Sequence, residues 1–272
     1  MSRCLNEVRL TPRSLPLQRV HQSAIRVEPA PDFQRHRTDY FGNDVSAFAV
    51  IDVHHKLTIS ARSLVEVDVG DHGKSAAPPA WPSWEEARDL IAATADAPCL
   101  EASEFLYPSP YVPAVTDLGS YARDTFEPGR PLIEAAKELN HRVYTEFKYD
   151  TKATSIDMPL ADVLRNRRGV CQDFAHVMIG ALRSLRLAAR YVSGYVRSGS
   201  KFQGAQASHA WVSLFVPGAG WINFDPTNDL MPTDSHVTLA WGRDYGDVSP
   251  VKGVTLGGGG QTIEVEVYVK AV

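Results

Sequence analysis

The chain has 272 residues, 44% of them hydrophobic and 22% charged, which suffices for one large globular domain or two modest ones; we expect two. A formal net charge of −4 and an isoelectric point near 6.1 exclude a broad basic surface, so neither nucleic acid nor a membrane is an expected partner. Three widely spaced cysteines, Cys4, Cys99 and Cys171, exclude a disulfide framework and a CxxC metal pattern. Without an apolar signal segment or membrane-spanning run, these features predict a cytoplasmic protein.

Residues 1–72 have the pattern of an all-β module. Apolar residues from Leu57 to Val69 alternate with polar ones, which is typical of a strand with one buried face. Shorter runs at residues 25–27 and 45–51 are expected to be its neighbours. The module should therefore form an independent sheet.

Residues 73–82, rich in glycine and proline, predict a linker before a second domain over residues 83–272. This domain should begin with helices. Ser83, with Glu86 three residues later, predicts a capping box at the first of them. The apolar spacing from residue 132 to residue 147 predicts an amphipathic helix, and a short helix should end near Arg167.

Cys171 stands at the expected start of another helix. Apolar residues recur after it at intervals of three and four, through Leu185, and Gly169 supplies a flexible turn before it. A thiol in the first turn lies beside unpaired backbone N–H groups and the positive end of the helix dipole, which favour the thiolate. We therefore predict that Cys171 is a nucleophile.

Two later segments supply partners for this thiol. His209 opens a strand-like run that ends at residue 216, and Asp225 closes the next run, just before Pro226. A hairpin of these two runs would bring Asp225 beside His209. The order Cys, His, Asp then fits a nucleophile, its base and the group that orients the base.

The strands at residues 189–196, 209–216 and 221–224 predict a helix packed on an antiparallel sheet, an α+β fold. A last strand is expected at residues 262–270, where β-branched and polar residues alternate. This strand could pair either with this sheet or with the N-terminal module.

Three segments resemble the motifs of the bacterial transglutaminase-like cysteine hydrolases: GVCQDFAH at residues 169–176, SHAWV at 208–212 and GWINFDPTN at 220–228. Residues 6–13 and 39–43 resemble the N-terminal β module of one bacterial branch, and residues 242–248 also fit that branch.

The resemblance implies a papain-like transglutaminase core with Cys171, His209 and Asp225 as a catalytic triad. Related chains usually carry another strand before residue 6, so either this chain begins late or its sheet lacks an edge strand.

The other candidate site residues concern the oxyanion and the substrate. The backbone N–H of Cys171 is an expected oxyanion donor. Well-known eukaryotic relatives use an upstream tryptophan as a second donor, and none lies between Trp84 and Trp211, so Tyr149 or Gln172 is the expected substitute. Trp211 and Tyr245 are expected to contact the substrate.

Five further polar residues have simpler interpretations. His176 is expected to be a packing residue, and Arg167 and Arg168 either hold the thiolate or cap a helix. His54 and His55 have no carboxylate or cysteine at ligand spacing, so we expect neither a metal nor any other cofactor.

The function expected from these residues is cysteine-dependent acyl transfer onto water: hydrolysis of a peptide, isopeptide or side-chain amide bond in a peptide or protein substrate. The first alternative is amine transfer to protein glutamine, as in a transglutaminase. It would require aromatic walls on both sides of the thiol, whereas Trp211 and Trp221 flank only the His and Asp side. The second alternative is a non-catalytic peptide-binding module. The sequence predicts no particular oligomeric state.

Overall fold

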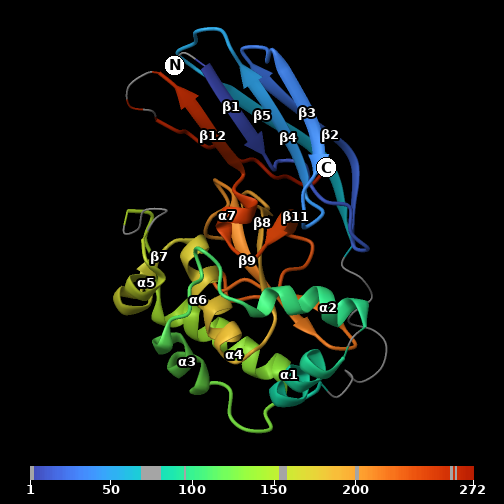
Figure 1. Ribbon diagram of the computed structural model, residues 1–272, viewed down its shortest axis with the longest axis vertical. Helices are drawn as coiled ribbons and strands as arrows, with labels where there is room; N and C mark the ends of the chain where they lie inside the picture. The colour runs from blue at the N-terminus through green and yellow to red at the C-terminus, as the bar shows by residue number, and fades with distance from the viewer. Residues whose placement is uncertain are drawn as a thin grey trace.

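The computed structural model of the protein describes residues 3–68, 81–94, 96–152, 158–199, 202–257, 260 and 262–272. Figure 1 shows β-strands from the two ends of the chain at one end of the molecule, helices at the other, and the strands of a further sheet between them. No helix in the described ranges combines the length and the apolar composition needed to span a bilayer.

The N-terminal part contains two antiparallel sheets. A four-stranded sheet has the order β12-β1-β4-β3, and a two-stranded sheet pairs β2 with β5. Side chains from both sheets, including Val8, Val27 and Phe48, form one small apolar core. The strands are β1 (Arg3–Val8), β2 (Gln18–Glu28), β3 (Phe33–Thr38), β4 (Asp44–Val50), β5 (Thr58–Val67) and β12 (Val251–Leu256).

The predicted strand at residues 57–69 corresponds to β5, although Val69 lies outside the described residues. The run at residues 25–27 lies in β2, which pairs with β5 as predicted. The run at residues 45–51 lies in β4, which instead belongs to the other sheet. The alternation identified the strands, but their partners depend on residues far away in the sequence.

The strand that returns to the N-terminal sheet is β12, which pairs with β1 along its whole length. Residues 83–272 are therefore not one continuous domain, because β1 would expose an unpaired edge without β12. The linker predicted at residues 73–82 falls mostly outside the described residues, which resume at Trp81.

The strand predicted at residues 262–270 is not formed. This segment has no regular secondary structure and makes hydrogen bonds to the loop before β9 (His209–Val216): Ser198 N–H donates to Val269 O at 2.8 Å, and Val267 N–H to Gln206 O at 3.2 Å. Its alternation buries no face, since Ile263 is 82% and Tyr268 is 83% exposed.

Two amide side chains fasten the N-terminal part to β11 (His236–Gly242). The Gln18 amide donates to Thr238 O and accepts from Thr238 N–H, both at 2.8 Å, and the Asn43 amide makes the same pair with Trp241 at 2.9 Å. The Arg13 guanidinium also lies 3.5 Å from the centre of the Trp241 ring. These contacts replace the independent sheet predicted from sequence with a module bound to the rest of the fold.

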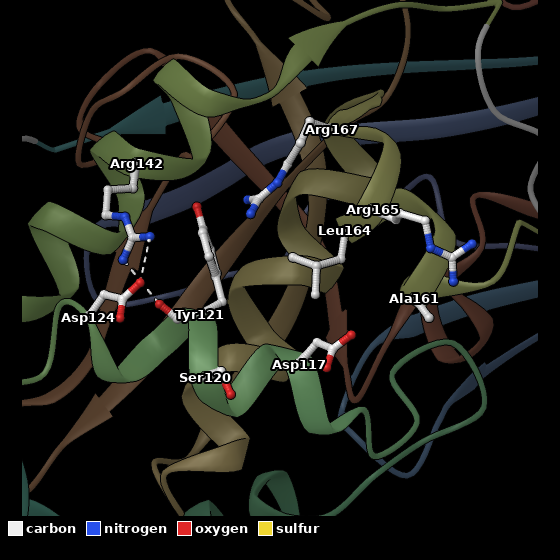
Figure 2. Close-up of a pocket in the computed structure, with 9 residues that line it drawn as sticks. All are labelled: Asp117, Ser120, Tyr121, Asp124, Arg142, Ala161, Leu164, Arg165 and Arg167. Atoms are coloured by element: carbon white, nitrogen blue, oxygen red, sulfur yellow. Dashed lines mark hydrogen bonds and ion pairs between the residues drawn. The ribbon is translucent and has the colours of Figure 1, made fainter.

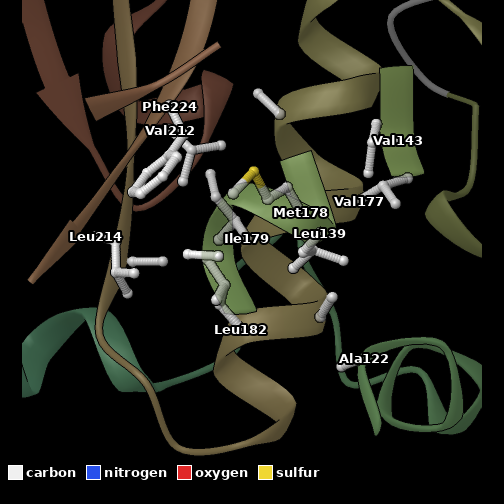
Figure 3. Packing of buried hydrophobic residues seen from close by; sticks show 14 of the residues in the cluster. Ala122, Leu139, Val143, Val177, Met178, Ile179, Leu182, Val212, Leu214 and Phe224 are labelled. Atoms are coloured by element: carbon white, nitrogen blue, oxygen red, sulfur yellow. The ribbon is translucent and has the colours of Figure 1, made fainter. Parts of the chain in front are cut away.

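The second sheet has the order β10-β9-β8-β11, all antiparallel, and α6 packs against β8 and β9. Figure 3 shows Met178, Ile179 and Leu182 of α6 in contact with α4 on one side and with β9 and β10 on the other. This helix on an antiparallel sheet confirms the predicted α+β class. The strands are β8 (Ala189–Val196), β9 (His209–Val216), β10 (Gly220–Phe224) and the short parallel pair β6 (Lys148–Tyr149) and β7 (Arg168–Gly169).

The helices begin and end close to where the sequence predicts. The capping box of α1 is formed, with Ser83 Oγ accepting from Glu86 N–H and the Glu86 carboxylate accepting from Ser83 N–H. Arg167, in the left-handed conformation, closes α5. The helices are α1 (Trp84–Ala93), α2 (Ala97–Ser103), the 3-10 turn η1 (Glu104–Leu106), α3 (Thr116–Arg123), α4 (Leu132–Glu146), α5 (Leu160–Asn166), α6 (Cys171–Ser184) and α7 (Tyr245–Val248).

Candidate active site

Cys171 is the first residue of α6, as its sequence predicts. The chain enters the helix through Gly169 and Val170, and the Asp173 carboxylate accepts the Val170 N–H at 2.8 Å. A Cβ at position 169 would lie 2.5 Å from that carboxylate, so only glycine permits this close approach. The cap fixes the first turn and leaves the thiol at the end of the helix, 8% exposed.

His209 and Asp225 meet as the hairpin of β9 and β10 predicts. The His209 Nε2–H donates to Asp225 Oδ2 at 2.8 Å, and the two residues are 1% and 0% exposed. The Cys171 side chain interacts with the same imidazole. His209 Nδ1 makes no hydrogen bond and is therefore the ring nitrogen left available to the thiol.

The Asp225 carboxylate accepts hydrogen bonds at both oxygens. Oδ2 accepts from His209, from His236 Nε2–H at 3.0 Å and from the Asn228 amide at 2.8 Å. Oδ1 accepts the backbone N–H groups of Thr227 and Asn228 at 2.9 and 3.3 Å. Five donors on one buried carboxylate stabilise its charged form.

His209 and Asp225 shift each other's pKa. Burial by itself would lower the pKa of His209, but the Asp225 carboxylate and the Cys171 side chain outweigh burial and raise that pKa to about 10. Burial would raise the pKa of Asp225, but His209 and His236 outweigh it and hold the pKa well below its usual range. At neutral pH the imidazole next to Cys171 is thus a cation paired with a carboxylate.

The sequence did not identify His236 and Asn228 as part of this site. His236 is the first residue of β11, on the far edge of the sheet from β10, and no local motif marks it. Asn228 had a signal, because it closes the same short segment as Asp225. Besides contacting Asp225, it exchanges two hydrogen bonds with the backbone of Gln203, in the loop that covers His209.

That loop screens the imidazole. Gly204 has a φ of +82°, and a Cβ placed there would lie 2.6 Å from His209 Nδ1. At Gly204 the loop therefore passes close to the Nδ1 side of the ring, and it helps to keep the charged pair out of bulk water.

The candidate oxyanion donors lie in different surroundings. Tyr149, in β6, is half-buried, and burial together with the charges of Cys171 and Asp173 raises its pKa, so its hydroxyl keeps its proton. Gln172 is the second residue of α6. Tyr191 of β8, which the sequence analysis did not select, is buried and also senses the charge of Cys171, which adds to burial in raising its pKa. Both tyrosines are thus phenol donors near the thiol.

The predicted substrate contacts need correction at one residue. Trp211 has no exposed surface; its ring stacks on His209 and meets the edge of His236, with centroid distances of 6.2 and 5.2 Å. It packs behind the imidazoles and cannot touch a substrate in this conformation. Tyr245, at the start of α7, is half-buried and packs against Tyr111 and Tyr191.

Arg167 does not contact the thiol. Figure 2 shows it beside a hollow of about 430 Å³ between α3, α4 and α5, where its guanidinium and that of Arg142 lie 4.6 and 4.4 Å from the ring centre of Tyr121. Arg167 also pairs with Glu146 at 3.0 Å. Of its two predicted roles, the one at the helix end is the one that its position fits, and none of Cys171, His209 and Asp225 lines this hollow.

In the described part of the chain, one group of three metal-ligand side chains occurs: His209, Asp225 and His236. Both Nε2 atoms lie at hydrogen-bond distance from the same oxygen of an acceptor-only carboxylate, so each nitrogen carries a proton there. A metal would need those nitrogens as lone-pair donors. The arrangement fits hydrogen bonding.

His176 is a buried packing residue, and its Nε2 accepts the Tyr245 N–H at 3.2 Å. Burial and, secondarily, Arg183 lower its pKa to about 3. An unfolded histidine has a pKa of about 6.5. Below that pH the unfolded chain therefore binds a proton at this residue, whereas the folded chain does not. This stabilisation is complete above pH ~6.5 and is lost as the pH falls toward 3.

We therefore expect the stability of the wild type to fall toward that of His176→Gln in acid, by up to about 1.4 kcal/mol per pH unit. Glutamine does not titrate, and its oxygen can accept the same Tyr245 N–H. Urea unfolding of both proteins between about pH 7 and pH 4.5 measures the difference. A difference that stays constant with pH would contradict a neutral buried imidazole.

Comparison with known proteins agrees with this geometry. Residues 1–66 match the bacterial transglutaminase-like N-terminal region, and residues 119–226 match the transglutaminase-like superfamily. An uncharacterized protein of Mycobacterium tuberculosis is 38% identical over 256 residues, which cover 90% of this chain and 79% of that protein.

Two further proteins are also similar to this chain. A protein-glutamine gamma-glutamyltransferase of Pseudomonas aeruginosa is 30% identical over 131 residues, 44% of this chain and 19% of that protein. The crystal structure of a "Putative Cysteine Protease" from Cytophaga hutchinsonii has the same fold, with a TM-score of 0.75 over 93% of this chain and 81% of that one, at 21% identity. The chain therefore belongs to the transglutaminase-like superfamily, in the group that carries the bacterial transglutaminase-like N-terminal region.

Proposed function

We propose that the protein is a cysteine-dependent acyl-transfer enzyme that hydrolyses peptide, isopeptide or side-chain amide bonds of a peptide or protein. The observation that supports this most is the buried His209–Asp225 ion pair beside the thiol at the start of α6. A cationic imidazole next to the sulfur stabilises a thiolate, which is the attacking species in cysteine chemistry.

In the proposed reaction the Cys171 sulfur attacks the carbonyl carbon of the amide. The carbonyl oxygen becomes an oxyanion, which the Cys171 N–H and a second donor stabilise. His209 then gives its proton to the nitrogen as the carbon–nitrogen bond breaks, so an amine leaves and a thioester remains. His209 next takes a proton from water, whose oxygen attacks the thioester, and the acid departs as the thiol re-forms.

The second oxyanion donor is proposed to be Tyr149. It lies on β6, whose partner β7 runs directly into Val170 and Cys171, and it stays protonated at neutral pH. Gln172 is the alternative from the helix itself, and Tyr191 is the alternative from β8. Removing one such donor from an acyl-transfer site typically costs about 100- to 1,000-fold in rate.

Hydrolysis is favoured over amine transfer because the aromatic residues considered for the walls of an amine tunnel, Phe174, Trp211 and Trp221, pack within the fold. Phe174 is buried in the core of the helical layer. Trp211 is buried behind His209, and Trp221 packs against Phe105, Phe215 and the Arg190 guanidinium. A thioester without a tunnel that selects an amine is open to water. The name of the Pseudomonas relative is what keeps amine transfer as the second candidate.

A mixture of glutamine-containing peptides offered together with a millimolar primary amine tests the choice. We expect mass spectrometry to show cleaved or deamidated peptides that carry no amine, and none of these with Cys171→Ala. Mainly amine-conjugated product would establish transfer instead. If neither product forms and iodoacetamide labels Cys171 as slowly as the buried Cys99, the protein is a non-catalytic binding module.

A further inference from the structure

A second imidazole touches the carboxylate that orients His209. His236 lies 4% exposed, and its Nε2 is 3.0 Å from Asp225 Oδ2, the oxygen that His209 Nε2 contacts at 2.8 Å. At its other nitrogen, Nδ1 is 3.0 Å from the Ser235 hydroxyl. We propose that His236 is a positioning residue for the reaction: it fixes the Asp225 carboxylate so that His209 presents Nδ1 to Cys171.

The protonation pattern follows from the acceptor. Asp225 stays ionised and can only accept, so His209 and His236 both carry a proton on Nε2. At the opposite end of the His236 ring, a hydrogen bond between Nδ1 and the Ser235 hydroxyl can run in either direction. The network therefore runs from Ser235 through His236 to Asp225 on one side and from His209 to Asp225 on the other, and it places a proton on Nε2 of each ring.

The need for a second imidazole comes from where Asp225 sits. It follows β10 in a turn, and the backbone N–H groups of Thr227 and Asn228 hold Oδ1 only. Rotation about this contact would swing Oδ2 away from His209 unless something holds it as well. His236 and the Asn228 amide supply that hold.

The sheet is shaped to bring His236 there. It comes from β11, and β8 separates that strand from β9. At Gly194 of β8 a Cβ would lie 2.4 Å from the Trp211 ring, so the indole occupies the space of the missing side chain. From there Trp211 supports both imidazoles, which keeps His236 within reach of Asp225.

The inference rests on the proposed cysteine chemistry, so its test uses a probe that needs no natural substrate. The rate constant for alkylation of Cys171 by iodoacetamide, followed by mass spectrometry, reports how well the imidazolium holds the thiolate. Cys99 is the internal reference, because burial and, secondarily, Asp96 raise its pKa to about 11.

Two variants distinguish the hydrogen bond that His236 donates from the packing of its side chain. His236→Leu removes the N–H and is expected to slow alkylation of Cys171 about tenfold at pH ~7, the loss of one hydrogen bond to a charged group. His236→Gln, whose amide nitrogen can reach the position of Nε2, should stay within about threefold of the wild type. Equal losses in both variants, or a folded His236→Leu with the wild-type rate, would overturn the proposal.

A measurement on the wild type guards against variants that fail to fold. Two-bond nitrogen–proton correlation spectra of protein labelled at histidine, assigned with His236→Gln, should show a proton on His236 Nε2 at pH ~7. A His236 Nε2 that carries no proton would contradict the network. Failure of the proposed function looks different, because wild-type Cys171 would then react no faster than Cys99 whatever the state of His236.

Discussion

Replacing Cys171 with alanine is expected to abolish turnover of any substrate that the wild type cleaves, by about five to six orders of magnitude. The thiolate is the only group in the proposed mechanism that forms a covalent bond to the substrate, and alanine offers none. The fold should survive, since alanine is a good helix former and the cap from Asp173 to Val170 N–H does not involve residue 171. Turnover of the purified variant measures the loss of activity, and its near-ultraviolet circular dichroism shows whether the fold is kept.

The matched control is Cys99→Ala. Cys99 is also buried, in α2, and has no part in the proposed site. Its replacement should leave turnover unchanged and cost only the small loss of packing that removing a sulfur brings. His209→Ala should lower turnover almost as much as Cys171→Ala. Without the imidazole the thiolate has no cation beside it, and the leaving amine has no proton donor. Normal turnover by Cys171→Ala would end the assignment of this residue.

Asp225→Asn is expected to lower turnover by about a thousand- to ten-thousand-fold, severely but less than the loss of the nucleophile. An asparagine amide has one acceptor oxygen where Asp225 has two. If its nitrogen takes the place of Oδ2, it faces the N–H groups of His209 and His236, and His209 must move its proton to Nδ1 to relieve the contact. A proton on Nδ1 points at Cys171, so the ring can no longer accept one from the thiol.

The variant should also be less stable than the wild type, by about 1–3 kcal/mol for each buried donor left without a partner. Urea unfolding measures this loss beside the kinetics. Asp234→Asn is the control, since Asp234 is half-exposed and its closest ion-pair distance, to Arg197, is 3.9 Å. It should change neither turnover nor stability. Wild-type activity in Asp225→Asn would show that this carboxylate does not orient His209.

The sequence alone determined the parts of this protein that depend on neighbours along the chain. The apolar spacing after Cys171, the glycine before it and the Ser83 and Glu86 pair each describe a turn or a helix start that the same few residues build. The hairpin of β9 and β10 is equally local, since only three residues separate its strands. For that reason the sequence by itself points to Cys171, His209 and Asp225 as one group.

Only the tertiary structure decided what lies behind those residues. The Gln18 amide finds its partner in Thr238, 220 residues away, and β1 finds β12 from the far end of the chain. Trp211, whose aromatic ring suggested a substrate contact, is fully buried, because Gly194 on the neighbouring strand leaves room for it.

His236 shows the physical reason for this division. Helical and strand periods record which face of an element is buried, but they carry no information on which buried polar group will meet which. That choice is made when the sheet closes and each buried donor must find an acceptor. His236 contacts Asp225 because β8 and β9 bring β11 to that position. The local sequence around either residue does not indicate this contact.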